Sequence, residues 1–372
     1  MHILFAGGGT AGHINPALAI ANYIKAQEPD TVISYIGTSK NLEARLVPAA
    51  GYDFYAIDVS GFQRKLTPSN IVKNVKAVAK VVTATSRSKK LLRTLNPDIV
   101  IGTGGYVSGP VLKAAAKLGI KTAIHEQNAF PGITTKALAP IVDRVMLAMP
   151  EAKKHLKLKN PCFEVGNPVR KELIETEREY ARKKLGLDSR PLILSFGGSL
   201  GARPINEAVT GLISSHNNTG KYYHIHAAGR AGYEGMKVSL DTACGQLSKE
   251  ITLREYIDDM NICMAAADLV ICRSGAITLS EICVCGKPSI LIPSPYVAEN
   301  HQYHNAMTLV NKKAAAIIEE KDLTPDKLTA LVDKLLSDTE NLKKMAHNVR
   351  KCAIPDSNEK IYKIIKGLYS QN

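Results

Sequence analysis

Short apolar runs alternate with amphipathic stretches along most of the chain. The runs have the length of buried strands, and the stretches between them repeat apolar residues at helical spacing. Strands that alternate with helices predict a parallel, doubly wound sheet. In the first half we predict strands at 2–6, 32–36, 54–57, 98–101, 121–124 and 144–147, and helices at 15–27, 40–50, 70–94, 109–118 and 132–139.

The pattern breaks between 160 and 170, where two prolines and a glycine indicate a domain boundary. A second strand–helix series then begins. It comprises helices at 171–186, from 204 and at 277–285, and strands at 191–196, 222–226, 251–253, 269–272, 289–292 and 315–318. We therefore predict an α/β protein with two Rossmann-like domains facing a cleft. The predicted divisions are 1–167, 168–353 and a C-terminal helix, 354–372, that crosses back to the first domain.

The composition supports large cores, since the 372 residues are 45% hydrophobic and 22% charged. Seven scattered cysteines favour buried thiols in a reducing compartment over a disulfide frame. Cys283 and Cys285 have no second pair and no nearby His, which argues against a zinc site. The sequence opens on a strand pattern, so we expect no signal peptide, and no apolar stretch reaches the roughly 18 residues of a membrane span.

Positive charge is concentrated in residues 1–168, which hold 21 Lys and Arg against 10 Asp and Glu, in a chain of net charge +14. This excess favours an anionic partner. With 5% aromatic residues, no Trp and no nucleic-acid motif, lipid headgroups or phosphates fit better than nucleic acid. The segment 64–94 is a basic amphipathic helix by pattern, which is typical of a membrane-surface helix. An ordinary surface helix with solvated lysines is the alternative.

Three polar or glycine-rich segments follow predicted strands of the first half: 7–13, 102–109 and 125–128. The carboxyl ends of parallel strands are where such sheets bind ligands. Glycines allow close backbone approach, and a helix start suits phosphate. His13 lies at the first of these turns, so it is a candidate reactive group; a tight strand-to-helix connection with a buried His is the alternative.

The second half repeats this arrangement, with a strand, the glycine turn 197–203 and a helix. Further on, small residues open the helix 277–285, and Glu281 lies one turn in. A carboxylate there would accept two sugar hydroxyls, for example those of a ribose. The alternative is an acid that only favours the helix dipole.

Two short motifs point elsewhere. Gly7-x-Gly9-x-x-Gly12 matches the dinucleotide fingerprint, but the strand at 32–36 ends without the acid that would hold an NAD ribose. Gly197-x-Ser199-x-Gly201 matches a nucleophile elbow, yet a second glycine turn in a second similar domain is better explained as a phosphate cradle.

Seven motifs fall in one order along essentially the whole chain, and together they resemble the MurG family. They are 8–13 (Gly-Gly-Thr-Ala-Gly-His), 104–110, 125–128 (His-Glu-Gln-Asn), 166–170, 197–203, 273–276 with 280–281, and 301–302 with 305–306. The family comprises bacterial glycosyltransferases of GT-B fold. The resemblance implies transfer of N-acetylglucosamine from UDP-GlcNAc to the MurNAc-pentapeptide of undecaprenyl-pyrophosphoryl lipid I, giving lipid II for peptidoglycan.

The resemblance also implies roles by position. His13 is the expected general base, with Glu126 as its competitor. The acceptor pyrophosphate would meet the loops that contain Gly9, Gly104, Gly105 and Tyr106. Ala11 stands where many members have Gly. The donor residues would be Thr10, Ala11, Gly12, Asn128, Arg170, Ser199, Ile257 (by its main-chain amide), Ala276, Ile277, Thr278, Leu279, Ser280, Glu281 and Gln302.

Inverting transfer needs a base for the acceptor hydroxyl and stabilisation of the leaving diphosphate, which helix starts and loop amides can provide. No Asp-x-Asp motif lies in a suitable loop, so we expect neither a metal nor another cofactor. A lipid-linked acceptor strengthens the membrane interpretation of 64–94, with the enzyme peripheral on the cytoplasmic side of the cell membrane; other cell-wall synthesis proteins are compatible partners. A glycolipid glycosyltransferase, a UDP-GlcNAc epimerase and a non-catalytic UDP-sugar sensor are the rival interpretations.

Overall fold

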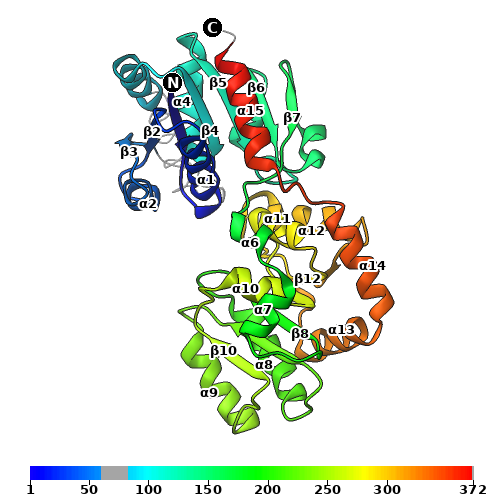
Figure 1. Ribbon diagram of the computed structural model, residues 1–372. Helices are drawn as coiled ribbons and strands as arrows, with labels where there is room; N and C mark the ends of the chain where they lie inside the picture. Colours follow the sequence, from blue (N-terminus) through cyan, green and yellow to red (C-terminus); the bar gives the residue numbers. More distant parts are fainter. Residues whose placement is uncertain (60–82, 371–372) are drawn as a thin grey trace. The chain divides into compact units, whose positions relative to one another are not determined.

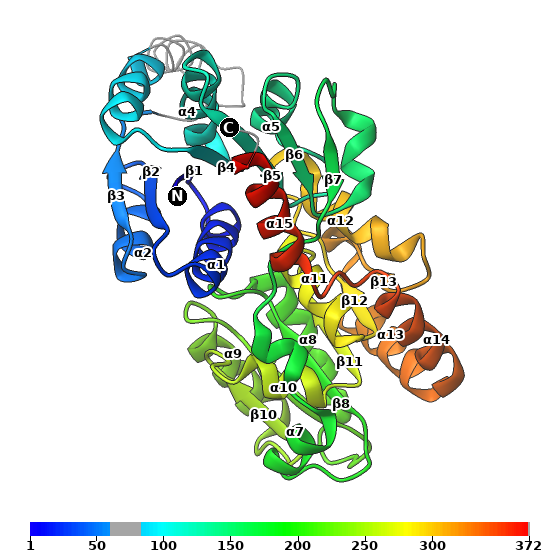
Figure 2. The same ribbon diagram turned by 45° about the horizontal axis from the view of Figure 1, so that its top comes forward.

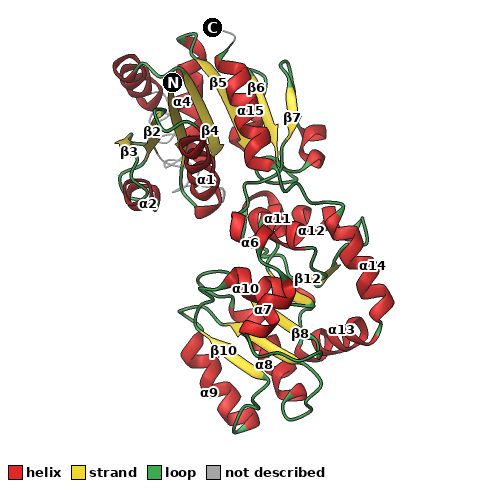
Figure 3. Ribbon diagram, in the orientation of Figure 1, coloured by secondary structure: helices red, strands yellow, loops and turns green. Residues whose placement is uncertain are grey.

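The computed structural model describes residues 1–59 and 83–370 (Figure 1). The chain divides into two compact units. Unit 1 is Met1–Pro168 with Asp356–Asn372, and unit 2 is Val169–Pro355. Each is built on one parallel sheet with helices on both faces, which confirms the predicted α/β fold class (Figure 3).

The unit 1 sheet has the strand order β3-β2-β1-β4-β5-β6-β7. Its central strand β4 is buried along its whole length, because helices cover both faces of the sheet. The strand β7 was not predicted, since it is only three residues long and lies next to a proline. The strands are β1 (His2–Gly7), β2 (Val32–Gly37), β3 (Asp53–Ala56), β4 (Ile99–Gly104), β5 (Lys121–Glu126), β6 (Arg144–Leu147) and β7 (Cys162–Glu164).

Two helical layers cover this sheet. One contains α1 (Ala11–Gln27), α2 (Glu43–Ala49) and α15 (Ser357–Tyr369), and the other contains helical residues 83–95, α4 (Gly105–Lys117), α5 (Ile133–Leu138) and the 3₁₀ helix Pro150–His155. Most of the predicted membrane helix, 64–82, lies outside the described residues. Within the ranges that are described, no helix is long and apolar enough to cross a bilayer.

The C-terminal helix α15 completes unit 1 and lies beside α1, as both ribbon views show (Figure 2). Ile361, Ile365 and Leu368 are buried in the same core as α1. The Tyr362 hydroxyl donates to the Glu28 carboxylate at 2.7 Å, and Lys366 also pairs with Glu28. The return of the chain is therefore secured by both apolar packing and charge.

Unit 2 has the strand order β10-β9-β8-β11-β12-β13. Its strands are β8 (Leu192–Phe196), β9 (Tyr223–Ala227), β10 (Ile251–Arg254), β11 (Leu269–Cys272), β12 (Ser289–Leu291) and β13 (Ala316–Ile317). The helices are α6 (Lys171–Glu175), α7 (Arg178–Lys184), α8 (Arg203–His216), α9 (Tyr233–Cys244), α10 (Met260–Ala266), α11 (Ala276–Cys285), α12 (His301–Val310), α13 (Pro325–Ser337) and α14 (Thr339–Arg350), with 3₁₀ helices at Ala298–Asn300 and Glu320–Asp322.

The helix predicted at 171–186 is wrong as a single element, because α6 and α7 are separate. Thr176 and Glu177 between them are extended, with ψ of 116° and 141°. Thr176 and Asn261 make a side-chain hydrogen bond of 2.9 Å that ties this break to α10. Contact with another part of unit 2 thus accompanies the interruption of the helical pattern.

Candidate active site

Two of the three predicted loops interlock at the carboxyl edge of the unit 1 sheet, because β1 and β4 are neighbours. A Cβ on Gly105 would come within 2.2 Å of the carbonyl oxygen of Gly8. The Tyr106 ring lies against Gly9, 3.2 Å from where a Cβ would stand. The acceptor-side residues predicted from the sequence, Gly9 and Gly104–Tyr106, therefore lie together.

A buried carboxylate supports the first loop from beneath. The side chain of Glu43, at the start of α2, is fully buried, and its Oε2 accepts the Gly9 N–H at 3.2 Å. Its Oε1 accepts the main-chain N–H and the hydroxyl of Thr38 at 3.1 and 2.8 Å. A Cβ on Gly8 would lie 2.4 Å from Oε1. Gly8 thus makes room for an acid that the sequence analysis did not single out.

His13 lies in the first turn of α1, facing both neighbouring loops. Gly104 has φ of +104°, which favours glycine, and a Cβ there would come within 2.6 Å of the His13 Nδ1 atom. That Nδ1 lies 3.3 Å from Oε1 of Gln127, the residue after β5 and its Glu126. The second and third loops therefore set the position of the imidazole.

Glu126 is 3% exposed and both its carboxylate oxygens are occupied. Oε1 accepts the main-chain and side-chain N–H groups of Asn128 at 3.0 and 3.1 Å. Oε2 accepts the Gly132 N–H at 3.1 Å and the Thr135 hydroxyl at 2.5 Å. These four hydrogen bonds use the Glu126 carboxylate to hold the loop after β5 in place. A carboxylate that already accepts four hydrogen bonds is poorly placed to take a proton from a substrate.

The remaining predicted donor residues of unit 1 surround His13. Thr10, Ala11 and Gly12 are exposed at the start of α1, and no side chain caps that helix. Asn128 is half-buried on the loop that Glu126 holds. Ala11 is helical and exposed, so the methyl group at this position meets no steric obstacle in the turn.

In unit 2, Glu281 and Arg170 face each other. Glu281 lies in the second turn of α11, and its Oε1 is 3.4 Å from the Arg170 guanidinium. Burial raises the pKa of the Glu281 carboxyl above its usual range, and the Arg170 charge opposes that rise. The pair thus connects Arg170, near the start of unit 2, to α11, the helix whose Glu281 is predicted to bind the ribose.

The other residues of unit 2 that are predicted to bind the donor substrate differ in how far their side chains are exposed to solvent. Ser199 is exposed on the loop after β8, and no side chain caps the α8 start that follows it. On α11, Ala276 and Leu279 are buried, whereas Ile277, Thr278 and Ser280 are partly exposed. The Ile257 side chain is buried as well. The Gln302 Oε1 accepts the Ser294 N–H at 2.8 Å, which holds this amide against the loop after β12.

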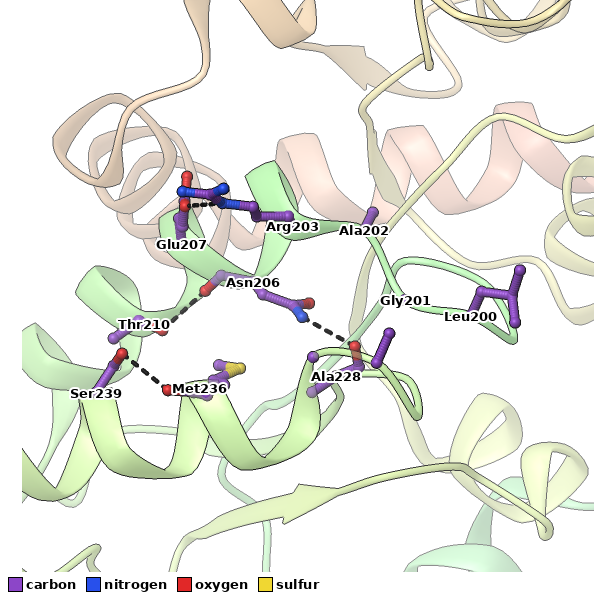
Figure 4. Close-up of a pocket in the computed structure, with 13 residues that line it drawn as sticks. Leu200, Gly201, Ala202, Arg203, Asn206, Glu207, Thr210, Ala228, Met236 and Ser239 are labelled. Carbon is purple, nitrogen blue, oxygen red and sulfur yellow. Dashed lines mark hydrogen bonds and ion pairs between the residues drawn. The ribbon is translucent and has the colours of Figure 1, made fainter.

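A pocket of about 630 Å³ opens between α8 and α9, beside the loop 197–202 (Figure 4). Asn206 crosses its inner end, donating from Nδ2 to the Ala228 carbonyl at 2.9 Å, and its Oδ1 contacts His226 Nε2 at 3.2 Å. The sequence analysis did not predict this pocket. Asn206 had no visible signal, because its partners are 20 and 22 residues away in the chain.

Comparisons with known proteins place the chain in a family. A model of the glycosyltransferase family 28 N-terminal domain matches residues 3–147, and one of the C-terminal domain of the same family matches 192–366. A relative from Acetivibrio thermocellus is 48% identical over 370 residues, covering 99% of this chain and 98% of its own. The chain belongs to the MurG family.

Other members agree. A relative from Ruminiclostridium cellulolyticum is 44% identical, covering 99% of this chain and all of its own. Both carry the name UDP-N-acetylglucosamine–N-acetylmuramyl-(pentapeptide) pyrophosphoryl-undecaprenol N-acetylglucosamine transferase. The crystal structure of MurG from Acinetobacter baumannii matches with a TM-score of 0.79 at 29% identity, over 98% of this chain and 99% of its own. The family and the GT-B fold predicted from the sequence are confirmed.

Proposed function

We propose that the chain transfers N-acetylglucosamine from UDP-N-acetylglucosamine to the 4-hydroxyl of the MurNAc-pentapeptide of undecaprenyl-pyrophosphoryl lipid I, with inversion, giving lipid II. The observation that carries the proposal is His13, set by two further loops at the sheet edge of a MurG-family chain. The near full-length relatives that bear this activity in their name support the choice of substrates.

His13 acts as the general base in this proposal. Imidazole is suited to accept a proton near neutral pH, which the acceptor hydroxyl must lose as it attacks the anomeric carbon. We assign the role to His13 over Glu126 because the Glu126 carboxylate already accepts four hydrogen bonds. Glu126 then serves catalysis by holding Asn128, which we assign to the donor sugar.

The donor would be held mainly by unit 2. The largely buried Glu281 carboxylate is suited to accept the ribose hydroxyls, and the Arg170 charge favours its ionised form. The leaving diphosphate would meet the loop at Ser199 and the starts of α8 and α11, at which no side chain caps the helix. Helix N-termini stabilise such charge through their dipole and their unpaired amides.

The membrane-facing surface would be the basic face of unit 1. In residues 83–95, Ala84, Ser88 and Leu92 are buried, while Arg87, Lys90 and Arg93 are exposed. Four further lysines (Lys153, Lys154, Lys157 and Lys159) are exposed at and after the 3₁₀ helix Pro150–His155, which packs on the same core layer. Lysines near an anionic leaflet each contribute about 1 kcal/mol of attraction. In this proposal the protein attaches peripherally to the cytoplasmic side of the cell membrane. Other cell-wall synthesis proteins remain predicted partners.

The deciding experiment measures transfer of radiolabelled N-acetylglucosamine from UDP-N-acetylglucosamine to a short-chain lipid I analogue, with an acceptor-free control and an EDTA arm. Labelled disaccharide-lipid that persists in EDTA is the expected result. Product only without EDTA would retain the transferase and remove the metal-free mechanism. Release of free sugar or UDP without labelled lipid would refute the proposed transfer.

A further inference from the structure

A chain of buried hydrogen bonds connects His13 to a carbonyl at the end of unit 1. It runs from His13 through Gln127 and His125 to the main-chain oxygen of Gly166. His125 is fully buried and Gln127 is 2% exposed. The motif 125–128 supplied two of the residues assigned above, but neither His125 nor Gln127 has a role in the proposed function so far.

The orientation of the Gln127 amide follows from one contact. Its Nε2 lies 2.9 Å from the main-chain oxygen of His125, which can only accept. The atom facing it must therefore be the NH₂ group, because the flipped amide would set oxygen against oxygen. In this orientation the Gln127 Oε1 faces the Nδ1 atom of His13 at 3.3 Å.

The second contact of Gln127 agrees with this orientation. The His125 Nε2 lies 2.9 Å from the Gly166 oxygen, so that nitrogen carries the ring proton. Burial lowers the pKa of His125, which keeps the ring neutral and leaves Nδ1 as an acceptor. That Nδ1 takes the other N–H of the Gln127 NH₂ group at 3.0 Å. Both protons of the NH₂ group are therefore used on His125.

An amide oxygen can only accept a hydrogen bond, so the His13 Nδ1 that faces it must carry a proton. Neutral imidazole has one ring proton, and the lone pair then belongs to Nε2. Within residues 1–59 and 83–370, no group hydrogen-bonds to that Nε2. It is thus the nitrogen available to take a proton from a substrate.

We propose that Gln127 is a positioning residue that fixes the tautomer of His13, with the proton on Nδ1 and the basic lone pair on Nε2, and that the Gly166 carbonyl sets this order through His125. The inference rests on the proposed function for its catalytic meaning, while the tautomer itself is independent of activity. Glutamine, unlike a carboxylate, accepts from Nδ1 without adding a negative charge beside the base.

The test is a two-bond ¹H–¹⁵N correlation spectrum of protein labelled with ¹⁵N-histidine, recorded at alkaline pH, where imidazole side chains are neutral. The His13 signals are identified by their loss in His13→Asn. We expect the Nδ1–H tautomer in the unaltered protein, and an Nε2–H tautomer there would overturn the proposal. Apart from His13→Asn, which assigns the signals, no variant is needed to determine the tautomer.

Two variants extend the test. Gln127→Met removes the acceptor, so we expect the His13 tautomer to shift toward Nε2–H. We expect kcat to fall roughly 100-fold, the lower end of the usual range for general-base catalysis, with the KM for UDP-N-acetylglucosamine unchanged. An unchanged tautomer in this variant would also overturn the proposal. Ser195→Ala is the matched control, because it removes a buried hydroxyl that hydrogen-bonds His224 and His226 in unit 2, and it should leave the His13 signals in place.

Gln127→Glu adds a carboxylate at the same place. We expect the acidic limb of the kcat/KM pH profile to move up by about 1 pH unit or more, as an adjacent opposite charge does. An unmoved limb would contradict the predicted contact. If His13→Asn retained full transfer activity, the base role in the proposed function would fail while the tautomer result would stand on its own.

Discussion

The two glycine loops look alike in sequence but are built differently. The loop after β1 packs against the backbone at Gly105 but is also supported by side chains: the Glu43 carboxylate takes the Gly9 N–H, and the Tyr106 ring lies against Gly9. The loop after β8 rests on backbone, since a Cβ on Gly201 would lie 2.0 Å from the Ala228 oxygen. Ser199 and Leu200 at its tip are exposed. A shared strand–glycine–helix pattern thus serves two purposes.

The difference bears on electrostatics. The Glu43 carboxylate takes up the Gly9 N–H, which is then no longer available to a phosphate group. An acid at this place would also repel a phosphate bound to the loop after β1. The second loop has no such acid among its described contacts, and it leads into an uncapped helix. We infer that the loop after β8 is the better phosphate site, and that the loop after β1 mainly carries His13, which Gly104 and Gln127 position.

The largest effect is expected on removing the support of the first loop. Glu43→Ala removes the acceptor of the partly buried Gly9 N–H and of the buried N–H and hydroxyl of Thr38. A buried donor without a partner costs about 1–3 kcal/mol, so unit 1 should lose roughly 3 kcal/mol or more of stability. Urea unfolding measures it, with Glu43→Gln as the conservative comparison. UDP binding by calorimetry should be unchanged in both; weakened UDP binding would contradict the division of roles between the loops.

The next effect concerns the second loop. Gly201→Ala places a methyl group against the Ala228 oxygen at φ of +78°, so the loop must shift, and we expect UDP to bind more weakly by a factor of roughly ten, since distortions of this kind cost about 1–3 kcal/mol. Gly198→Ala is the matched control, because its φ is +97° but nothing lies within 4 Å of its Cβ. Equal losses in both variants would show that strain alone, and not the collision, weakens binding.

A smaller effect concerns the acid of unit 2, in contrast to that of unit 1. Burial raises the Glu281 pKa, so acidification should protonate this carboxyl and raise the KM for UDP-N-acetylglucosamine. Arg170→Met removes the charge that lowers this pKa, and the rise in KM should therefore begin at higher pH. Lys171→Met, which removes a neighbouring exposed cation, is the control. Identical pH profiles for Arg170→Met and Lys171→Met would contradict the pairing.

The smallest effect distinguishes the units by their response to alkali. Burial lowers the pKa of Lys287 to about 8 from the ordinary 10.5, while its ammonium donates to the Ala265 and Ala267 carbonyls. Between these values the unfolded chain binds more protons than the folded one, so the contribution of Lys287 to stability rises with pH. Urea unfolding of unit 2 at pH 7.5 and 10 should show this rise in the unaltered protein and not in Lys287→Met; the same rise in both would exclude Lys287 as its source.

Most strands of the fold could be predicted because they are local runs of apolar residues. The first residues of helices were harder to predict from the sequence. The helix predicted at 109–118 begins at Gly105, since glycines in a sequence indicate a loop, whereas here Gly104 and Gly105 allow the chain to turn directly into α4. The strand β7 and the break between α6 and α7 depend on contacts with other elements, which no local pattern contains.

The candidate site divides in the same way. His13, Glu126 and Glu281 were predicted by their place at strand ends and helix starts, and by the resemblance. Glu43 and Gln127 were not singled out, because the contacts that tie them to Gly9 and His13 span 34 and 114 residues of the chain. The strand 32–36 ends without an acid; Glu43 comes a few residues later, inside α2, and its carboxylate reaches back to the Gly9 N–H.

The return of α15 to unit 1 affects how the chain is made. A ribosome adds roughly 5–20 residues per second, so α15 follows Pro168 by on the order of 10–40 seconds. During that interval unit 2 is still being synthesised, and the apolar side of α1, with Ile20 and Ile24, has no cover from α15. Unit 1 can therefore complete its core only after α15 has been made, and until then chaperones can bind the uncovered side of α1.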